Sequence, residues 1–367
     1  MIILSNFMSI KAVVMAGGKG TRLRPITYSI PKPVVPIAGK PCMLYLLDSY
    51  YNAGIKDVII TTGYKFSSLI TSIIENRHND QAILFSVEKE PAGTAGSVKM
   101  VSNFIDDTLI VGSGDILSDF NISDIINFHK KNKAMVTIVL TEVEDPRQFG
   151  IVEMENNRIV RFLEKPDRDQ TFSHIASTGI YVIEPEILDY ITTMPYDFAK
   201  DLFPELMKRN IDIYGYMGKG VWLDTGRPND LITANQIMVE KYGKLSDGDL
   251  IKGKNIILDM AGIHNTGIEK CYIGRNIKAG DNVHIKDSAL YDNENIGNNV
   301  EITNSLLMDN VTVRENTKIR NSVIMRNCVI GENSEIVDSI IAPDMDLRGK
   351  SRIYNVSLAS KVIEDEM

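Results

Sequence analysis

The chain has 367 residues, of which 44% are hydrophobic and 24% charged, and it carries a formal net charge of −8. Its length exceeds what one hydrophobic core usually supports, and its composition is that of a soluble globular protein, which excludes disordered and fibrous classes. A negative net charge, with Lys and Arg scattered along the chain, argues against nucleic acid as a partner.

Three cysteines, Cys42, Cys271 and Cys328, are widely separated and show no C-x-x-C spacing. This pattern predicts neither a disulfide framework nor a zinc site. The apolar opening of the chain has no cation ahead of its apolar stretch, so it does not resemble a signal peptide. No apolar run reaches the ~20 residues that a membrane-spanning helix needs. We therefore expect a cytoplasmic protein with reduced thiols and no membrane partner.

Strand and helix patterns alternate over the first two thirds of the chain. Residues 11–16 form a buried apolar run that ends at a glycine-rich turn, and residues 43–53 have a helical periodicity that ends at Gly54. The alternation continues with strands over 57–63, 109–115 and 135–140 and a helix over 124–132. This pattern predicts an α/β fold with a doubly wound, mainly parallel sheet, whose ligands bind at the carboxyl ends of the strands.

A 17-residue repeat replaces the helical periodicity from about residue 253. Similar tetrapeptides, each an Asn or Asp, a Ser and two apolar residues, start at Asp287, Asn304, Asn321 and Asp338. A fixed short period indicates a solenoid. Because 17 is one short of three six-residue units, each repeat resembles one triangular coil of a left-handed parallel β-helix, with Asn, Asp or Gly at its tight corners. An ordinary β-sandwich with short strands is the alternative.

These two patterns predict a first domain over residues 1–240, a linker over 241–252 and a β-helix domain over 253–367. Stacked coils leave two open ends that need to be covered. We therefore expect a homo-oligomer that forms through the β-helix domain.

The glycine-rich turn after the first strand reads Gly17-Gly-Lys-Gly-Thr-Arg-Leu-Arg-Pro-Ile-Thr. It has neither the Walker order G-x-x-x-x-G-K-[ST] nor the dinucleotide order G-x-G-x-x-G. Its glycines allow backbone N–H groups to approach phosphate oxygens closely, and Arg22 supplies a permanent planar cation for a triphosphate. Lys32, on the stiffened Pro31-Lys-Pro segment, can place a point charge on the α-phosphate.

This motif resembles the signature of the sugar-nucleotide pyrophosphorylases, G-G-x-G-T-R-L-x-P-x-T followed by P-K-P, which stands here at 17–33. Further landmarks of that family follow in order: Glu-Pro-Ala-Gly-Thr-Ala-Gly at 90–96, Gly114-Asp115, Phe-Leu-Glu-Lys-Pro at 162–166, Thr178-Gly-Ile-Tyr and Trp222-Leu-Asp-Thr-Gly. Together with the β-helix tail, the resemblance is strongest to mannose-1-phosphate guanylyltransferases and related glucose-1-phosphate enzymes with β-helix tails. It implies a Rossmann-like nucleotidyltransferase domain and the conversion of GTP and mannose 1-phosphate to GDP-mannose and pyrophosphate.

The resemblance also implies roles for individual residues. The implied catalytic residues are Arg22, Lys32, Asp115, Lys165 and Asp224. Among them Asp115 and Asp224 are the two carboxylates expected to hold Mg²⁺, an ion that prefers hard oxygen ligands, and Lys165 is the cation for the sugar phosphate. Without the family, either aspartate would be interpreted as a helix cap or a turn residue.

Two further sets of residues follow from the same resemblance. The implied nucleotide-binding residues are Ala16, Gly17, Gly18, Gly20, Thr21, Glu88, Gly93 and Thr94. The implied sugar-binding residues are Gly150, Glu164, Ser177 and Thr178, with Glu164 as the acceptor for sugar hydroxyls.

The chemistry of such a reaction explains the need for cations. A sugar phosphate oxygen must attack the α-phosphorus of an anionic nucleotide, and each pair of like unit charges near 4 Å repels by about 4 kcal/mol at an effective dielectric of 20. We therefore expect catalysis to consist mainly of charge neutralisation and in-line positioning, without a protein nucleophile.

Glu88 indicates the base in our interpretation. In the family, the residue five positions before the first glycine of the 90–96 loop, which is Gly93 here, faces the base. Guanine presents two neighbouring N–H groups, which suit a carboxylate, whereas uracil or thymine suits an amide such as Gln. Glu88 therefore favours guanine, and a solvated charge is its alternative interpretation. Ser177 stands where guanylyltransferases usually have Asn, so mannose is the first choice and glucose stays open. Ala92 likewise replaces the Leu that is usual in the base loop.

Three other functions fit parts of the sequence. The same chemistry could serve thymidylyl or uridylyl transfer onto glucose 1-phosphate. A regulatory subunit of the same fold could bind a sugar nucleotide without turnover, although all five implied catalytic residues are present. Left-handed β-helices also host acyl transfer with a histidine base, but only His264 and His284 lie in the tail and a fold alone does not define a function.

Overall fold

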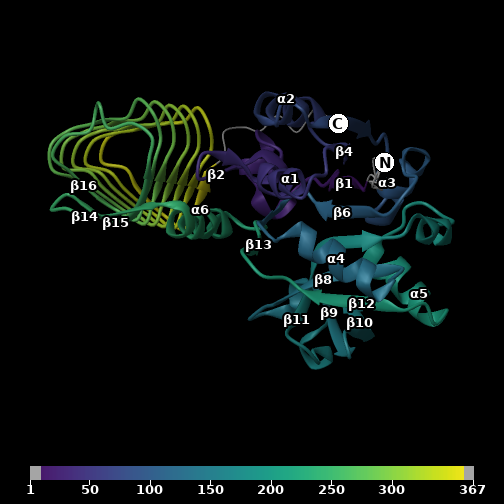
Figure 1. Ribbon diagram of the computed structural model, residues 1–367. Coiled ribbons are helices and arrows are strands. Elements are labelled where there is room, and N and C mark those ends of the chain that lie inside the picture. The colour runs from purple at the N-terminus through teal and green to yellow at the C-terminus, as the bar shows by residue number, and fades with distance from the viewer. Residues whose placement is uncertain (1–9, 359–367) are drawn as a thin grey trace. The chain divides into compact units, whose positions relative to one another are not determined.

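The computed structural model describes residues 10–358 and divides the chain into two compact units (Figure 1). The first unit consists of the chain through Lys19 together with Cys42–Trp222, and the second of Gly20–Pro41 together with the chain from Leu223 onward. Each unit contains two separate stretches of the chain. The domain bounds predicted from the sequence therefore stay a prediction. Most of the apolar opening of the chain lies outside the described residues.

A nine-stranded mixed sheet forms the centre of the first unit. Its strands are β1 (Lys11–Ala16), β4 (Asp57–Thr62), β5 (Ala82–Val87), β6 (Leu109–Ser113), β8 (Val136–Glu142), β9 (Gly150–Glu155), β10 (Arg158–Glu164), β11 (Ile175–Ile183) and β12 (Ile213–Met217). They lie in the order β5-β4-β1-β6-β11-β8-β12-β10-β9. Strands β5, β4, β1 and β6 run parallel to one another, as do β8 and β12. Strand β11 runs antiparallel to both β6 and β8. The predicted Rossmann-like α/β fold is confirmed, with an antiparallel part added to its parallel core.

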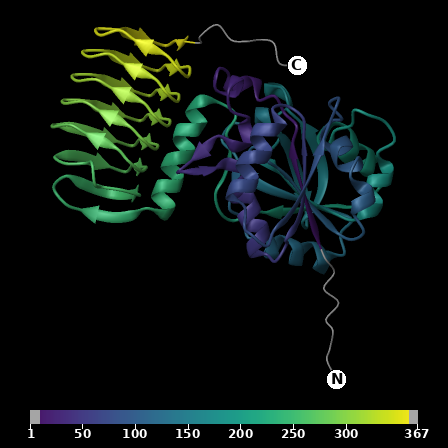
Figure 2. The same ribbon diagram turned by 90° about the horizontal axis from the view of Figure 1, so that it is seen from above.

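The helices of the first unit lie on both sides of this sheet (Figure 2). They are α1 (Cys42–Asn52), α2 (Phe66–Asn76), α3 (Thr94–Lys99), α4 (Ile122–Asn132) and α5 (Phe203–Lys208), and the short strand β7 (Ile116–Ser118) precedes α4. The start of α4 is fixed by Asn121, whose side-chain oxygen accepts hydrogen bonds from the Ser123 and Asp124 N–H groups. Lys133, in the left-handed conformation, ends the same helix.

The core of the first unit fills the space between the sheet and its helices. Val13 of β1, Val111 of β6 and Ile138 of β8 have no exposed surface, and they share a cluster with Phe198 and Phe203. A strand that is buried on both faces needs apolar side chains at nearly every position, which explains the continuous apolar runs of β1 and β6.

The second unit contains a parallel β-helix with three faces. Its first face has β16 (Thr266–Glu269), β19 (Val283–Lys286), β22 (Glu301–Thr303), β25 (Lys318–Arg320), β28 (Glu335–Val337) and β31 (Arg352–Tyr354). The second face has β17 (Tyr272–Ile273), β20 (Ala289–Leu290), β23 (Leu306–Leu307), β26 (Val323–Ile324), β29 (Ile340–Ile341) and β32 (Ser357–Leu358). The third face has β18 (Lys278–Ala279), β21 (Asn295–Ile296), β24 (Thr312–Val313), β27 (Val329–Ile330) and β30 (Asp346–Leu347). Figure 2 shows the coils stacked on one another.

Each coil of this β-helix is one 17-residue repeat. His284 pairs with Glu301, and Glu301 pairs with Lys318, so the register advances by one repeat from strand to strand. At one corner Asn304 and Asn321 adopt left-handed φ angles of 48°, and the Asn304 amide donates to the Asn321 side-chain oxygen at 2.8 Å. Apolar residues of successive coils form a continuous buried core. The predicted left-handed β-helix is confirmed, and the β-sandwich alternative is wrong.

The second unit also contains a hairpin, a strand pair, a helix and part of a short strand. They are the hairpin β2 (Pro36–Ile37) and β3 (Lys40–Pro41), the strand pair β14 (Lys244–Asp247) and β15 (Ile251–Ile257), the helix α6 (Pro228–Tyr242) and the short strand β13 (Trp222–Asp224), which begins in the first unit. Helix α6 runs beside the first coils (Figure 2) and contacts β15, β17 and β20. This helix therefore links the strand that carries Asp224 to the start of the β-helix.

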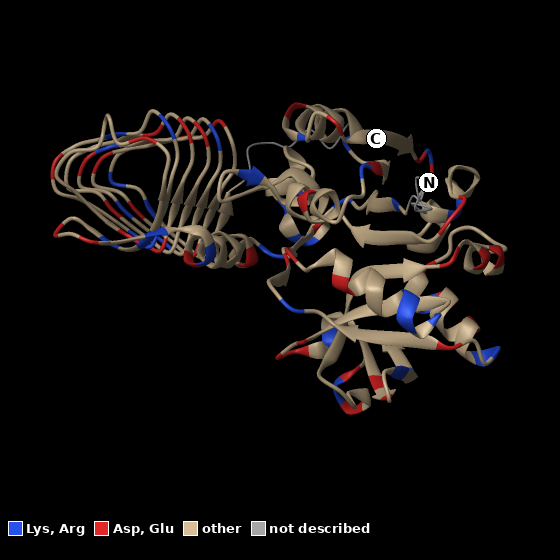
Figure 3. Ribbon diagram, in the orientation of Figure 1, with Lys and Arg blue, Asp and Glu red and all other residues tan. Residues whose placement is uncertain are grey.

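Charged residues of both signs are interspersed in each unit, as Figure 3 shows for the ribbon of residues 10–358. On the β-helix, opposite charges pair between neighbouring coils, with Lys286 at 2.9 Å from Glu269 and Lys318 at 3.1 Å from Glu301. Exposed ion pairs of this kind contribute only about 0–1 kcal/mol each. Within the described part of the chain, no helix has the length and apolar character needed to cross a membrane.

Candidate functional site

Four predicted site residues of the first unit, Ala16, Gly17, Gly18 and Asp115, lie at the carboxyl ends of the neighbouring parallel strands β1 and β6. Met15 near the end of β1 pairs with Ser113 at the end of β6, and the Gly114 N–H donates to the Met15 carbonyl oxygen at 2.8 Å. Ala16, Gly17 and Gly18 follow directly after Met15 in one chain segment, and Asp115 follows Gly114 in the other. The sheet topology therefore places the glycine turn and Asp115 at one edge, as expected for a ligand site.

Asp115 is held by a contact within its own turn. The Ser113 hydroxyl donates to the Asp115 Oδ1 atom at 2.5 Å. Such a bond fixes the direction of the carboxylate, and it leaves further lone pairs on the two oxygens.

Glu88 lies beside the glycine turn. One oxygen of its carboxylate accepts the Ala92 N–H at 3.2 Å, and a Cβ built on Gly17 would lie 3.5 Å from the other oxygen. Burial raises the pKa of Glu88 above its ordinary value, while the Ala92 N–H acts in the opposite direction. The carboxylate is therefore a half-buried group at the glycine turn, and the interpretation as a freely solvated charge is less favoured by this environment.

The loop over residues 92–96 is fastened from one side by residues 196–198. The Tyr196 backbone accepts the N–H groups of Ala95 and Gly96 and donates to the Ala92 carbonyl oxygen, each at 2.9 Å. Gly93 has a φ of 77°, and a Cβ at this position would lie 2.5 Å from the Tyr196 carbonyl oxygen. Only glycine fits both the conformation and the space at this point of the loop.

Thr94 at the start of α3 is fastened by its side chain. Its hydroxyl donates to Asp197 at 2.9 Å and accepts the Phe198 N–H at 2.9 Å. No motif indicates Asp197, because this residue lies 103 residues after Thr94 and outside every recognised pattern. Sequence reasoning therefore missed Asp197, which supports the loop over residues 92–96 through Thr94.

The predicted sugar-phosphate residues lie on the β9–β10 pair. Gly150 pairs with Glu164, and a Cβ on Gly150 would approach the Glu164 carboxylate to 2.9 Å. Lys165 has a left-handed φ of 47° and lies 3.5 Å from Glu164, measured from Nζ to Oε1. Burial raises the pKa of Glu164, and the charge of Lys165 opposes this shift. Because Gly150 has no side chain, the Glu164 carboxylate and the Lys165 ammonium can lie close together at this point.

Ser177 and Thr178 lie on the neighbouring strand β11. The Ser177 hydroxyl is shielded from solvent. The Thr178 hydroxyl donates to the Val139 carbonyl oxygen at 2.8 Å, and the Thr178 carbonyl oxygen accepts the indole N–H of Trp222 at 3.0 Å. The side chain of Thr178 therefore has a structural partner, and its predicted contact with a sugar stays a prediction.

A second group of predicted site residues belongs to the second unit. The Lys32 ammonium lies 2.9 Å from Asp224 Oδ1, and the Arg22 guanidinium lies 3.4 Å from Asp224 Oδ2. Lys32 is only 6% exposed, so its charge is held in a protected position. The structure thus brings together two cations and a carboxylate that lie about 190 to 200 residues apart in the chain.

The glycine signature continues into this second unit. Gly20 adopts a left-handed φ of 60°, and the Thr27 hydroxyl donates to the Gly20 carbonyl oxygen at 2.9 Å. Thr21 and Arg22 belong to a single 3-10 turn that follows Gly20. A Cβ at Gly226 would lie 3.3 Å from the Arg22 guanidinium carbon, so the glycine of Trp-Leu-Asp-Thr-Gly allows the close approach of this arginine.

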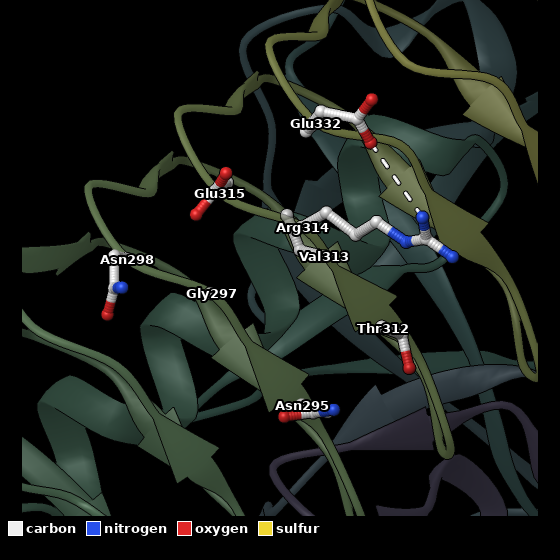
Figure 4. Close-up of a pocket in the computed structure, with 8 residues that line it drawn as sticks. All are labelled: Asn295, Gly297, Asn298, Thr312, Val313, Arg314, Glu315 and Glu332. Carbon is white, nitrogen blue, oxygen red and sulfur yellow. Dashed lines mark ion pairs between the residues drawn. The ribbon is translucent and has the colours of Figure 1, made fainter.

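Two hollows open on the described surface away from the predicted site residues. One of about 390 Å³ lies on the β-helix (Figure 4) and is crossed by the Arg314–Glu332 ion pair of 3.8 Å. Another of about 730 Å³ lies on the first unit between Tyr190, Tyr196 and Arg209. Neither contains a residue that the sequence predicts for the nucleotide or the sugar.

Comparison with known families agrees with the fold and with these residues. Residues 11–241 match the family model described as nucleotidyl transferase, and residues 299–354 match the GlmU-like C-terminal hexapeptide model. The chain therefore belongs to the nucleotidyl transferase family and is an enzyme of that class.

Individual relatives narrow this class further. A mannose-1-phosphate guanyltransferase of Yarrowia lipolytica is 33% identical over 263 residues, covering 68% of this chain and 71% of that protein. Mannose-1-phosphate guanyltransferase beta-B of Xenopus laevis is 36% identical over 231 residues, covering 61% of this chain and 63% of that protein. Among solved structures, HddC from Yersinia pseudotuberculosis complexed with GMP-PN is 25% identical with a TM-score of 0.54, covering 62% of this chain and 98% of that one. The predicted resemblance is confirmed.

Proposed function

We propose that this protein transfers the guanylyl group of GTP to mannose 1-phosphate, forming GDP-mannose and releasing pyrophosphate. The observation that carries the choice of base is the half-buried Glu88 carboxylate beside Gly17, which offers acceptors for the two N–H groups of guanine. The relatives support the same choice, because two of them are mannose-1-phosphate guanyltransferases and one similar solved structure is complexed with GMP-PN.

The reaction needs cations more than it needs a nucleophile from the protein. An oxygen of the sugar phosphate forms a bond to the α-phosphorus, and the bond from that phosphorus to the bridging oxygen breaks, so pyrophosphate leaves in line. We assign Arg22 and Lys32 to the phosphates of GTP and Lys165 to the phosphate of the sugar. These groups lower the repulsion between two anions, which is about 4 kcal/mol for each unit pair near 4 Å at an effective dielectric of 20.

We assign the sugar of mannose 1-phosphate to the β9–β10 strand pair. Glu164, which shares that pair with Lys165, can accept hydrogen bonds from sugar hydroxyls because it remains 19% exposed despite its burial among neighbours. Ser177 and Thr178 complete the proposed sugar-binding group, with Gly150 leaving room for it. This assignment makes Glu164 the residue that orients mannose relative to its phosphate.

Asp115 and Asp224 fit a magnesium site in their donor chemistry, since both offer the carboxylate oxygens that Mg²⁺ prefers. Residues 10–358 contain no group of three or more potential metal-ligating side chains. Mg²⁺ commonly takes one or two carboxylates from a protein and its other ligands from phosphates and water. We propose these two aspartates as its ligands; when bound, the ion neutralises phosphate charge.

A substrate matrix tests the proposal. Pyrophosphate release is measured with GTP, ATP, UTP and dTTP, each with mannose 1-phosphate and glucose 1-phosphate. We expect the highest kcat/KM for GTP with mannose 1-phosphate. Preference for dTTP or UTP with glucose 1-phosphate would support the thymidylyl or uridylyl alternative, and no release with any pair would support a regulatory subunit.

A substitution at Glu88 tests the base contact separately. Glu88→Gln should lower kcat/KM for GTP by about 5- to 150-fold, the equivalent of the roughly 1–3 kcal/mol lost with an unmatched buried polar group, while sparing UTP. Glu75→Gln, at an exposed glutamate of α2, is the matched control and should change neither substrate. Equal losses for GTP and UTP would contradict the assignment of Glu88.

Location and assembly are proposed on the sequence evidence. We propose a cytoplasmic protein and a homo-oligomer that forms through the β-helix. Size-exclusion chromatography with light scattering measures the assembly, and a monomer at micromolar concentration would contradict it.

A further inference from the structure

The cationic segment Gly20–Pro41 packs with the β-helix unit. Leu23, Ile26 and Val35 of this segment have no exposed surface, and they share one hydrophobic cluster with α6 and with successive coils of the β-helix. The cluster members from α6 and the coils are Leu231, Ile232, Val239, Tyr272, Ala289, Tyr291, Leu306, Met308, Val323, Met325 and Ile340. The residues next to Arg22 and Lys32 in the chain are therefore anchored on the solenoid.

The buried side chains of Asn235 and Tyr291 form a polar clamp beside these apolar residues. The side-chain oxygen of Asn235 on α6 accepts the Ala38 N–H at 2.7 Å and the Tyr291 hydroxyl at 2.8 Å. The amide nitrogen of Asn235 donates to the Leu231 carbonyl oxygen at 2.8 Å, which fixes its orientation. Asn235 is 3% exposed and Tyr291 4%, so water does not replace these bonds readily. One side chain thus joins the hairpin, the helix and a coil.

The turn of the β2–β3 hairpin, which the clamp contacts at Ala38, has positive φ angles at both of its residues. Ala38 and Gly39 connect β2 to β3 with φ angles of 45° and 78°, the arrangement that tight two-residue hairpin turns require. A Cβ at Gly39 would overlap the Tyr272 hydroxyl of the first coil. The turn is therefore set directly against the β-helix, and its position follows that of the coil.

The clamp connects the two chain segments that carry Lys32 and Asp224. Lys32 opens the 3-10 turn that leads through the buried Val35 into the clamped hairpin, and the Val35 N–H donates to the Lys32 carbonyl oxygen at 3.2 Å. Asp224 lies four residues before the start of α6, the helix that carries Asn235. A shift of Asn235 would therefore move the two charges relative to each other.

We propose that Asn235 and Tyr291 are positioning residues for Lys32 and Asp224, so that the first coils of the β-helix are part of the phosphate-binding machinery. The proposal rests on the proposed function, in which Lys32 meets the nucleotide. The clamp residues touch no substrate, and they act by fixing the segment that carries the cation. A displacement of a catalytic group by about 1 Å is enough to lower a rate by 10²-fold.

The experiment compares full-length variants in the pyrophosphate-release assay. Tyr291→Phe removes one hydroxyl and leaves the Asn235 oxygen bonded to Ala38; we expect kcat to fall by roughly 10-fold, within the range that small misplacements cause, with KM for mannose 1-phosphate unchanged. Asn235→Leu removes both contacts and should lower kcat further. Tyr354→Phe, whose hydroxyl bonds Glu335 at 2.9 Å on an exposed coil surface, is the matched control.

The outcomes separate the proposal from the function on which it rests. Unchanged kcat in Tyr291→Phe with an active wild type would overturn the positioning role. If the wild type itself turns over no substrate pair, hydrogen exchange of a peptide covering residues 32–41 decides instead. Faster exchange in Tyr291→Phe than in Tyr354→Phe supports the clamp, and equal exchange overturns it. Tyr291→Phe keeps the test decisive even if Asn235→Leu does not fold.

Discussion

The carboxyl group of Glu294 lies inside the β-helix, where it is 1% exposed and has no hydrogen-bond partner among residues 10–358. One repeat earlier and one repeat later, the equivalent positions hold Ile277 and Val311, which are both buried. Burial raises the pKa of Glu294 well above its ordinary value, and the nearby charges of Asp309 and Asp292 add to this shift. We expect Glu294→Leu to stabilise the protein.

The direction of the pH dependence follows from the raised pKa. The folded protein holds a proton that the unfolded chain releases near the ordinary value of 4.5, so the free energy of unfolding falls as the pH rises from there toward the folded-state pKa. Each pH unit inside this window removes about 1.4 kcal/mol. The missing hydrogen bond adds about 1–3 kcal/mol to the cost of burial. The gain from Leu should therefore be larger at alkaline than at acid pH.

Urea denaturation of the full chain, followed by circular dichroism, measures this gain. We expect the variant to exceed the wild type in free energy of unfolding at about pH 5 and at about pH 8, with a wider gap at pH 8 than at pH 5. Glu315→Leu, at an exposed position of the same β-helix, is the control and should change stability by no more than about 0.5 kcal/mol. A variant less stable than the wild type at pH 8, or a gap independent of pH, would refute the reasoning.

Three further outcomes are expected. Gly150→Ala places a methyl group 2.5 Å from the Phe162 ring and 2.9 Å from the Glu164 carboxylate; steady-state kinetics should show KM for the sugar phosphate raised roughly 10- to 100-fold with KM for GTP unchanged, and equal changes in both would contradict this. Arg22→Ala should lower kcat by about 10²–10³-fold in the pyrophosphate assay, and near-normal turnover would remove Arg22 from the mechanism. Burial raises the pKa of the Cys271 thiol to about 12 and of Cys328 to about 11, so a thiol reagent at neutral pH should label these residues only after denaturation, and rapid labelling of the native protein would contradict their burial.

Local and periodic features are what the sequence by itself determined. The apolar run of β1 and the helical spacing of α1 follow from the backbone periods of strand and helix, so their positions were predicted to within a residue or two. The 17-residue repeat predicted the β-helix for the same reason, since one repeat must close one coil for the next to stack in register. The family signature named Arg22 and Lys32, and the roles of these residues stay proposals.

Only the tertiary structure decided which distant residues meet. The alternation of strands and helices did not reveal that β11 inserts antiparallel between β6 and β8, because strand order depends on long-range pairing. Nor did any motif indicate Asn235 and Tyr291, since an amide on a helix and a tyrosine in a coil acquire a role only when packing brings them to the Ala38 N–H. Burial and hydrogen bonding at such sites are properties of the folded chain, because water satisfies the same groups before folding.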